Sequence, residues 1–282
     1  MNEPYIDAHV HFWDPARLPY PWLAAAPGLA GAHLPEDYAR ATAADPAEHY
    51  VFVEADCARD RASDELAWVE SLAGRDSRLA AIVPHVTVDR GRESERALDA
   101  LASHPLVRGV RHLVQDESDP RHAARPEFVA GVRAAGRRGL GFELCCRPVQ
   151  WAAAAALARA CPETTIVLDH AGKPAIGGDI APWQRAIDRL AACPNVVGKL
   201  SGLVTEADHR TWQVADLRPY FNHLYAAFGP DRLLFGSDWP VVTLAASPLR
   251  WREAVRVLTA KLSAPERAAL FRGTARRIYR LP

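Results

Sequence analysis

Hydrophobic residues rich in β-branched side chains recur in eight short runs, and segments with helical periodicity separate these runs. The runs lie near 5–13, 49–56, 79–88, 107–114, 139–146, 164–172, 196–202 and 233–240. Strands that alternate with helices pair in parallel, and eight such units in roughly 240 residues are the number and size expected of a (β/α)8 barrel. The pattern therefore predicts an α/β fold, a TIM barrel forming one catalytic domain over 1–282. An open doubly wound sheet is the alternative.

Helices are predicted in the segments between the runs. They cover Ser63–Gly74, Ser94–Ser103, Glu127–Arg138, Gln150–Ala160, Trp183–Ala192 and Arg218–Phe228. Pro126 at one predicted start, and Gly139 and Gly229 just after two predicted ends, are typical of helix boundaries. Two further helices are predicted after Ser247, the second beginning near Pro265.

The first and last runs carry short motifs able to bind a metal or move a proton. They read Ile6-Asp7-Ala8-His9-Val10-His11 and Phe235-Gly236-Ser237-Asp238-Trp239-Pro240. Side chains alternate faces along a strand, so Asp7, His9 and His11 are predicted to share one side. Two histidines in this spacing can bind one ion; the alternative is one exposed and one buried structural histidine. Asp238 joins them only if the first and last strands meet, as they do in a closed barrel.

Polar residues collect where the predicted strands end, which is where barrel enzymes carry their active sites. They are His9, His11, Glu54, Asp56, His85, Arg111, His112, Glu143, Asp169, His170, Lys199, Ser201 and Asp238. Polar groups in apolar strands are costly unless paired or used, so their concentration at one end predicts an enzyme. Singly, Asp238 could form a turn, His170 could be a core histidine, and Lys199 could pair with a buried carboxylate such as Glu143.

Composition narrows the possible partners. The 34 basic and 34 acidic residues give no formal net charge, which argues against nucleic acid or an anionic membrane as a partner. No apolar run reaches transmembrane length and no secretory leader is recognisable, so a cytoplasmic protein is expected. The five cysteines lack C-x-x-C spacing and are predicted to be reduced and mostly buried. The aromatic segment 13–22 is either a rigid surface loop or a wall of the substrate pocket.

Four segments resemble the amidohydrolase superfamily, specifically its amidohydrolase-related (amidohydrolase 2) branch, and within it the sugar-lactone lactonases such as L-fuconolactonase. They are IDAHVHFWD at 6–14, LDHAGKP at 168–174, GKLSGL at 198–203 and LLFGSDWPV at 233–241. The branch also contains pyrone-dicarboxylate lactonases, decarboxylases and hydratases. The resemblance implies a distorted (β/α)8 barrel that hydrolyses a small-molecule sugar lactone and holds one divalent metal, zinc.

The resemblance also implies roles for individual residues. His9 and His11 become metal ligands, Asp238 the general base that activates water and a further ligand, and His170 the group that binds the substrate carbonyl. Decarboxylase relatives place a histidine where this chain has Glu143, so either Glu143 replaces it in a single-metal site or the reaction needs no metal. This departure disfavours a decarboxylase, and the same strand also lacks the lysine that, when carboxylated, bridges two metals, which disfavours a binuclear centre. Substrate contacts are predicted at Arg111, His112, Lys199, Trp13, Trp239 and His85. The alternative for the two tryptophans is that they belong to the hydrophobic core.

Other functions remain open on the sequence. One is a decarboxylase or hydratase of an unsaturated diacid, or a pyrone-dicarboxylate-type lactonase. Two or more arginines that converge on the pocket would favour a diacid substrate. The predicted strand ends carry Arg111, and Arg147 is a second candidate. Hydrolysis of a phosphoester or amide, and binding of a sugar acid or metal without turnover, are further alternatives. Both Asp238 and His170 are present, which favours an enzyme.

Overall fold

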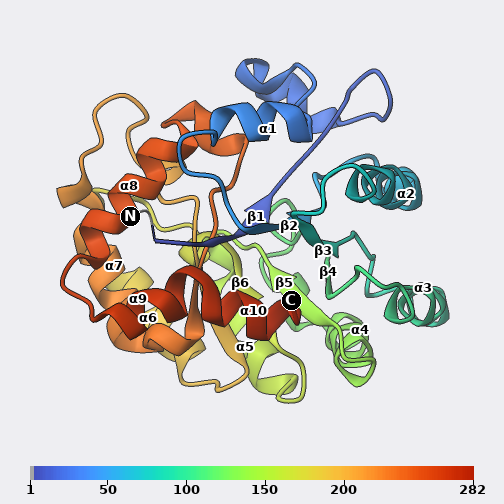
Figure 1. Cartoon of the computed structure of the whole chain (residues 1–282). Coiled ribbons are helices and arrows are strands. Elements are labelled where there is room, and N and C mark those ends of the chain that lie inside the picture. Colours follow the sequence, from blue (N-terminus) through green and yellow to red (C-terminus); the bar gives the residue numbers. More distant parts are fainter. Residues whose placement is uncertain (1–2) are drawn as a thin grey trace.

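Eight parallel strands form a barrel with helices around it (Figure 1), as the computed structural model of residues 3–282 shows. The strands are β1 Ile6–Val10, β2 His49–Val53, β3 Leu79–Val83, β4 Gly109–Arg111, β5 Gly141–Leu144, β6 Ile166–Leu168, β7 Val196–Leu200 and β8 Leu233–Phe235. Each predicted run contains one strand, so the (β/α)8 prediction is confirmed. Residues 1 and 2 of the predicted domain lie outside the described residues.

Backbone hydrogen bonds close the ring of strands. The strands pair in chain order as β1-β2-β3 and β4-β5-β6-β7-β8. The Ile82 N–H donates to the Leu106 carbonyl at 2.9 Å, which joins β3 to the segment entering β4. The Asp238 N–H donates to the His9 carbonyl at 2.9 Å, which joins the end of β8 to β1. The motifs at the two ends of the sequence are therefore neighbours, as predicted.

Helices cover the outside of the barrel (Figure 1). They are α1 Pro35–Ala41, α2 Ala62–Ala73, α3 Arg92–Ala102, α4 Pro126–Arg137, α5 Trp151–Ala160, α6 Ala181–Ala191, α7 Val214–Phe228, α8 Pro248–Thr259, α9 Ala264–Ala268 and α10 Thr274–Tyr279. The predicted helices are present, although α7 begins at Val214 rather than Arg218. Ser263 caps α9 in a reciprocal capping box with Glu266. Within residues 3–282, no helix is both long and apolar enough to cross a membrane.

A β-bulge in β1 changes which residues face the barrel interior. The pairing of β1 with β2 shifts register after Asp7, so the two-residue alternation of side chains is broken there. Asp7 faces the surrounding helices, where its carboxylate accepts hydrogen bonds from the Tyr38 hydroxyl at 2.9 Å and the Ser237 N–H at 2.7 Å. The prediction that Asp7 shares one side with His9 and His11 is therefore wrong.

The barrel interior is apolar at one end and charged towards the other. The apolar cluster contains Ile6, Ala8, Val51, Val53, Ala81, Val83, Val167, Val197, Leu234, Ala275 and Tyr279. Ala275 and Tyr279 come from α10, which packs against β1 and β8. Asp169 lies two residues after Val167, and Lys199 lies two residues after Val197. Both charged side chains are also buried. We call Glu54, Arg111, Glu143, Asp169 and Lys199 the charged layer; it lies under the candidate site.

Candidate active site

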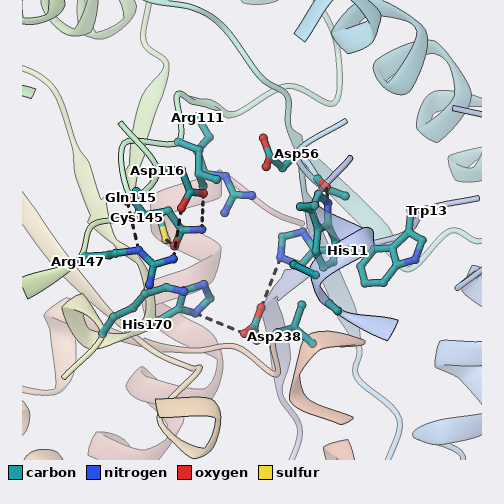
Figure 2. A pocket seen from close by; sticks show the side chains of 17 residues that line it. His11, Trp13, Asp56, Arg111, Gln115, Asp116, Cys145, Arg147, His170 and Asp238 are labelled. Carbon is teal, nitrogen blue, oxygen red and sulfur yellow. Dashed lines mark hydrogen bonds and ion pairs between the residues drawn. The ribbon is translucent and has the colours of Figure 1, made fainter. Parts of the chain in front are cut away.

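A cavity of about 410 Å³ lies where the strands end, a size typical of small-molecule pockets (Figure 2). Its apolar wall includes Trp13, Trp22, Leu113 and Val241, and its polar wall contains His11, Asp56, Arg111, Gln115, Asp116, Arg147, His170, Lys173 and Asp238. The aromatic segment after β1 therefore forms part of the pocket. Of the predicted site residues, His11, Trp13, Arg111, His170 and Asp238 lie in this wall.

Asp238 stands between two histidines in the cavity. Its Oδ1 lies 3.4 Å from His11 Nε2 and its Oδ2 lies 3.9 Å from His170 Nδ1; Figure 2 shows both rings directed at the carboxylate. Burial alone would raise the pKa of Asp238, but His170, His11 and His9 outweigh this effect and hold the pKa below its usual range. Asp238 is therefore an ionised carboxylate that can accept a proton.

His170 is held by the segment that follows β7. Its Nδ1 lies 2.9 Å from the Ser201 hydroxyl oxygen. Gly202 has φ +64°, and a Cβ there would come within 2.7 Å of the His170 Cβ, so this position requires glycine. Burial lowers the pKa of His170 to about 4, so the ring is neutral at pH 7. When a neutral ring accepts from Ser201, its Nε2 carries the proton and can donate to a ligand.

The two histidines of the first motif face each other. Their Nε2 atoms are 3.0 Å apart, and His11 Nδ1 donates to the Val53 carbonyl at 2.8 Å, so the neutral His11 ring carries its lone pair on Nε2. His9 Nε2 lies 3.8 Å and His11 Nε2 3.4 Å from Asp238 Oδ1. Ligands about 2.0 Å from a tetrahedral ion lie about 3.3 Å apart, close to the sides of this triangle. The donor atoms therefore fit a divalent metal such as zinc.

The charged layer supports His9 from below. Lys199 is fully buried, forms an ion pair with Glu143 and another with Asp169 at 3.0 Å, and lies 2.9 Å from His9 Nδ1. Burial pushes the pKa of Glu143 upwards and the Lys199 ammonium opposes this, whereas Lys199 and His9 outweigh burial at Asp169 and lower its pKa. Asp169 Oδ1 also lies 3.3 Å from His9 Nδ1, a carboxylate–imidazole contact that orients metal-binding histidines.

Arg111 connects the charged layer with the cavity. Its Nε donates to Glu54 Oε1 at 2.6 Å and its Nη1 donates to Asp169 Oδ2 at 3.4 Å. The side chain is almost completely buried although it reaches the cavity wall. Two carboxylates therefore neutralise this guanidinium, and it brings little net positive charge to a ligand.

Two predictions fall on the charged layer. Glu143, predicted as a metal ligand, uses its two carboxylate oxygens for Lys199 and the Tyr279 hydroxyl, and with His9 and Asp169 it forms a group whose atoms could hold an ion. Cys145, two residues after Glu143, reaches the cavity, as does Arg147. Lys199, predicted as a substrate contact, is buried below the site. The alternative reading of Lys199, a partner for a buried carboxylate, is the one confirmed.

Three other predicted substrate contacts also lie elsewhere. His112 faces away from the barrel interior because it follows the inward-facing Arg111, and its ring packs against Phe128. Trp239 is buried against Tyr38 and other aromatic side chains. His85 lines a separate cavity bordered by α2 and α3. These three assignments are corrected: each residue is next to the site in sequence but points into other surroundings.

The sequence interpretation gave no role to several polar residues of the cavity. Asp56 was noted at the end of the second strand, and Lys173 lies within the LDHAGKP segment. Gln115 and Asp116 come from the long segment after β4, and Asp116 forms an ion pair with Arg147 at 3.3 Å. The signal for Lys173 was its place in the LDHAGKP segment, which did not show that it would lie beside His170. The loop residues carried no such signal.

Comparisons with known proteins place this chain among enzymes. The family model described as Amidohydrolase matches residues 6–281. The chain is 38% identical to a Burkholderia multivorans protein named L-fucono-1,5-lactonase, over 98% of this chain and 96% of the relative. It is 32% identical to a Burkholderia ambifaria protein of the same name, over 98% and 95%. A crystal structure of a Burkholderia multivorans amidohydrolase with bound zinc has a TM-score of 0.88 and 37% identity, covering 99% of this chain and 100% of that one.

Proposed function

The chain belongs to the amidohydrolase family, and on this basis we propose that it hydrolyses a sugar lactone, L-fucono-1,5-lactone or a related L-sugar lactone, to the free sugar acid. The two relatives named L-fucono-1,5-lactonase support this substrate class. One structural observation carries the proposal: the ionised Asp238 carboxylate stands between His11 and His170 in the wall of the cavity.

Asp238 acts as the general base in this proposal. It accepts a proton from water while the water oxygen attacks the lactone carbonyl carbon, a role worth about 10²–10⁴-fold in rate. The neutral His170 ring donates its Nε2–H to the carbonyl oxygen and polarises it. When the tetrahedral intermediate collapses, the ring carbon–oxygen bond breaks and protonated Asp238 returns its proton to the departing ring oxygen. The products are the sugar acid and an unchanged enzyme.

We also propose one divalent metal, zinc, held by His9, His11 and Asp238. The spacing of their donor atoms and the zinc in the similar Burkholderia multivorans structure support this assignment. His170 is a further donor within reach of His9 and Asp238. A zinc ion bound there lowers the pKa of a bound water and polarises a carbonyl.

The charge of the cavity suits a neutral polyol. Arg111 is paired with Glu54 and Asp169, and Arg147 with Asp116, so both arginines are balanced by carboxylates. A diacid would require free cations on more than one side, whereas a sugar lactone requires hydrogen-bonding groups and an apolar wall. The amide and carboxylate side chains of the cavity provide the hydrogen-bonding groups, and its two tryptophans provide the apolar wall.

A pH-indicator assay of acid release tests the proposal. Purified enzyme is mixed with L- and D-aldono-1,5- and 1,4-lactones, before and after chelation, and metal content is measured on the same samples. We expect release above the spontaneous rate from the L-fucono series, and loss of zinc in a His11→Ala variant. The absence of catalysed release from every lactone would refute the proposal, and unsaturated diacids would then be assayed for decarboxylation and hydration.

A further inference from the structure

Four consecutive residues after β6 adopt left-handed backbone conformations. The φ angles are 51° at His170, 53° at Ala171, 71° at Gly172 and 51° at Lys173. Only the glycine adopts this region without steric cost. The Lys173 N–H donates to the His170 carbonyl at 2.8 Å, which closes a single left-handed turn. An uncommon backbone of this kind persists only when its surroundings hold it in place.

Two indole donors, one buried and one partly buried, hold this turn from outside the cavity. The indole N–H of Trp151 donates to the Gly172 carbonyl at 2.7 Å. The indole N–H of Trp183 donates to the Ala171 carbonyl at 2.8 Å. Two tryptophans from α5 and α6 are thus used to fix two adjacent carbonyl groups. Backbone strain concentrates where it positions functional groups, so the side chains presented by this turn are candidates for such groups.

The turn presents His170 and Lys173 to the same space. In a turn with hydrogen bonds three residues apart, side chains at the first and fourth positions lie on the same side. Both residues line the cavity that contains Asp238, which agrees with this geometry. Lys173 therefore places an ammonium group beside His170, in the wall that also carries the base.

The Lys173 ammonium remains available to a ligand. Its Nζ lies 3.6 Å from Glu206 Oε1, an ion pair longer than a hydrogen bond, and within residues 3–282 it has no hydrogen-bond acceptor. Burial alone would lower the pKa of Lys173, but Cys145, Glu206 and Asp238 outweigh burial and raise it. Glu206 holds the side chain towards the site without saturating its three N–H donors.

We propose that Lys173 is a catalytic residue whose ammonium binds the lactone carbonyl oxygen as that oxygen becomes negatively charged. This inference rests on the proposed lactone hydrolysis. As the water oxygen bonds to the carbonyl carbon, the carbonyl electron pair moves to oxygen, where Lys173 and His170 stabilise the charge, and Asp238 takes the proton. The electron pair on the oxyanion then re-forms the carbonyl bond, the bond between the carbonyl carbon and the ring oxygen breaks, and the ring oxygen receives the proton of Asp238. The acid formed loses the second proton of the water to solvent, and Lys173, which keeps its own protons throughout, then faces the product carboxylate.

Two neutral variants, Lys173→Met and Lys173→Gln, test this role. Both keep a Cβ in the left-handed backbone, so the strain of the turn is unchanged. Lys261→Met, at an exposed lysine, is the matched control. Since one oxyanion donor is worth about 10²–10³-fold in kcat, we expect a loss of that size in both variants, with a much smaller change in KM. The inhibition constant of the product acid should rise in parallel, and Lys173→Arg should recover part of the activity.

The outcomes separate this inference from the proposed function. If the wild-type enzyme hydrolyses no lactone, the proposed function fails before any variant is compared. If the wild-type enzyme is active and either folded neutral variant keeps kcat within about threefold of it, the assignment of Lys173 is refuted. An unchanged product inhibition constant would also refute it, because a lysine that only supports the fold does not contact the product.

Discussion

Asp238→Asn is expected to reduce lactone hydrolysis by about 10²–10⁴-fold while leaving the fold intact. An amide cannot take the proton of the attacking water, and the neighbouring His170 cannot replace it while its Nδ1 is engaged with Ser201. The backbone tolerates the change, because Asp238 has φ +62° and asparagine is among the side chains that accept this region best. Acid release and circular dichroism on the same preparation measure the two effects.

A matched control is Asp231→Asn, since Asp231 is an exposed aspartate on the outside of the molecule. It should retain wild-type turnover. If folded Asp238→Asn protein keeps more than about a tenth of the wild-type rate, Asp238 is not the general base. The base would then have to be sought among the other carboxylates of the cavity, of which Asp56 is the first candidate.

Lys199→Met is expected to destabilise the protein by about 3–5 kcal/mol, because it removes one partner from a buried ion-pair network. Glu143 and Asp169 would lose their shared cation in a fully buried environment. Glu143→Gln should cost less than half as much. Its amide oxygen can still accept from Lys199 and its amide NH₂ can donate to the Tyr279 oxygen. The free energy of unfolding in urea measures both losses.

The exposed Lys261→Met variant is the control for this series, and a change within about 0.5 kcal/mol is expected there. A loss below about 1 kcal/mol in Lys199→Met would contradict the account of the charged layer. Equal losses in Lys199→Met and Glu143→Gln would contradict the expectation that an uncharged amide of the same shape replaces the Glu143 carboxylate.

The fold was predictable because it depends on patterns that repeat. The eight runs have the length and spacing of strands, and each contains one. The neighbouring positions of His9 and Asp238 followed from barrel closure alone. The orientation of Asp7 was not predictable, since a β-bulge adds one residue to the strand and no sequence period reports it.

The sequence indicated which residue types lie near the site, but not how far each side chain lies from the cavity. A polar residue near a strand end can face the cavity, lie in the charged layer or point outwards, and a shift of one or two residues decides among these. Glu143 therefore fell below the site and Cys145 within it. Lys173 was missed because a left-handed turn, rather than a strand or helix period, brings it beside His170.

The most direct test of the central claim is hydrolysis of L-fucono-1,5-lactone in ¹⁸O-labelled water, followed by mass spectrometry of the acid. We expect catalysed acid release above the spontaneous rate, with one ¹⁸O atom in the carboxylate and none in the hydroxyl derived from the ring oxygen. Acid release no faster than in buffer, or label in that hydroxyl, would contradict attack by an Asp238-activated water on the lactone carbonyl.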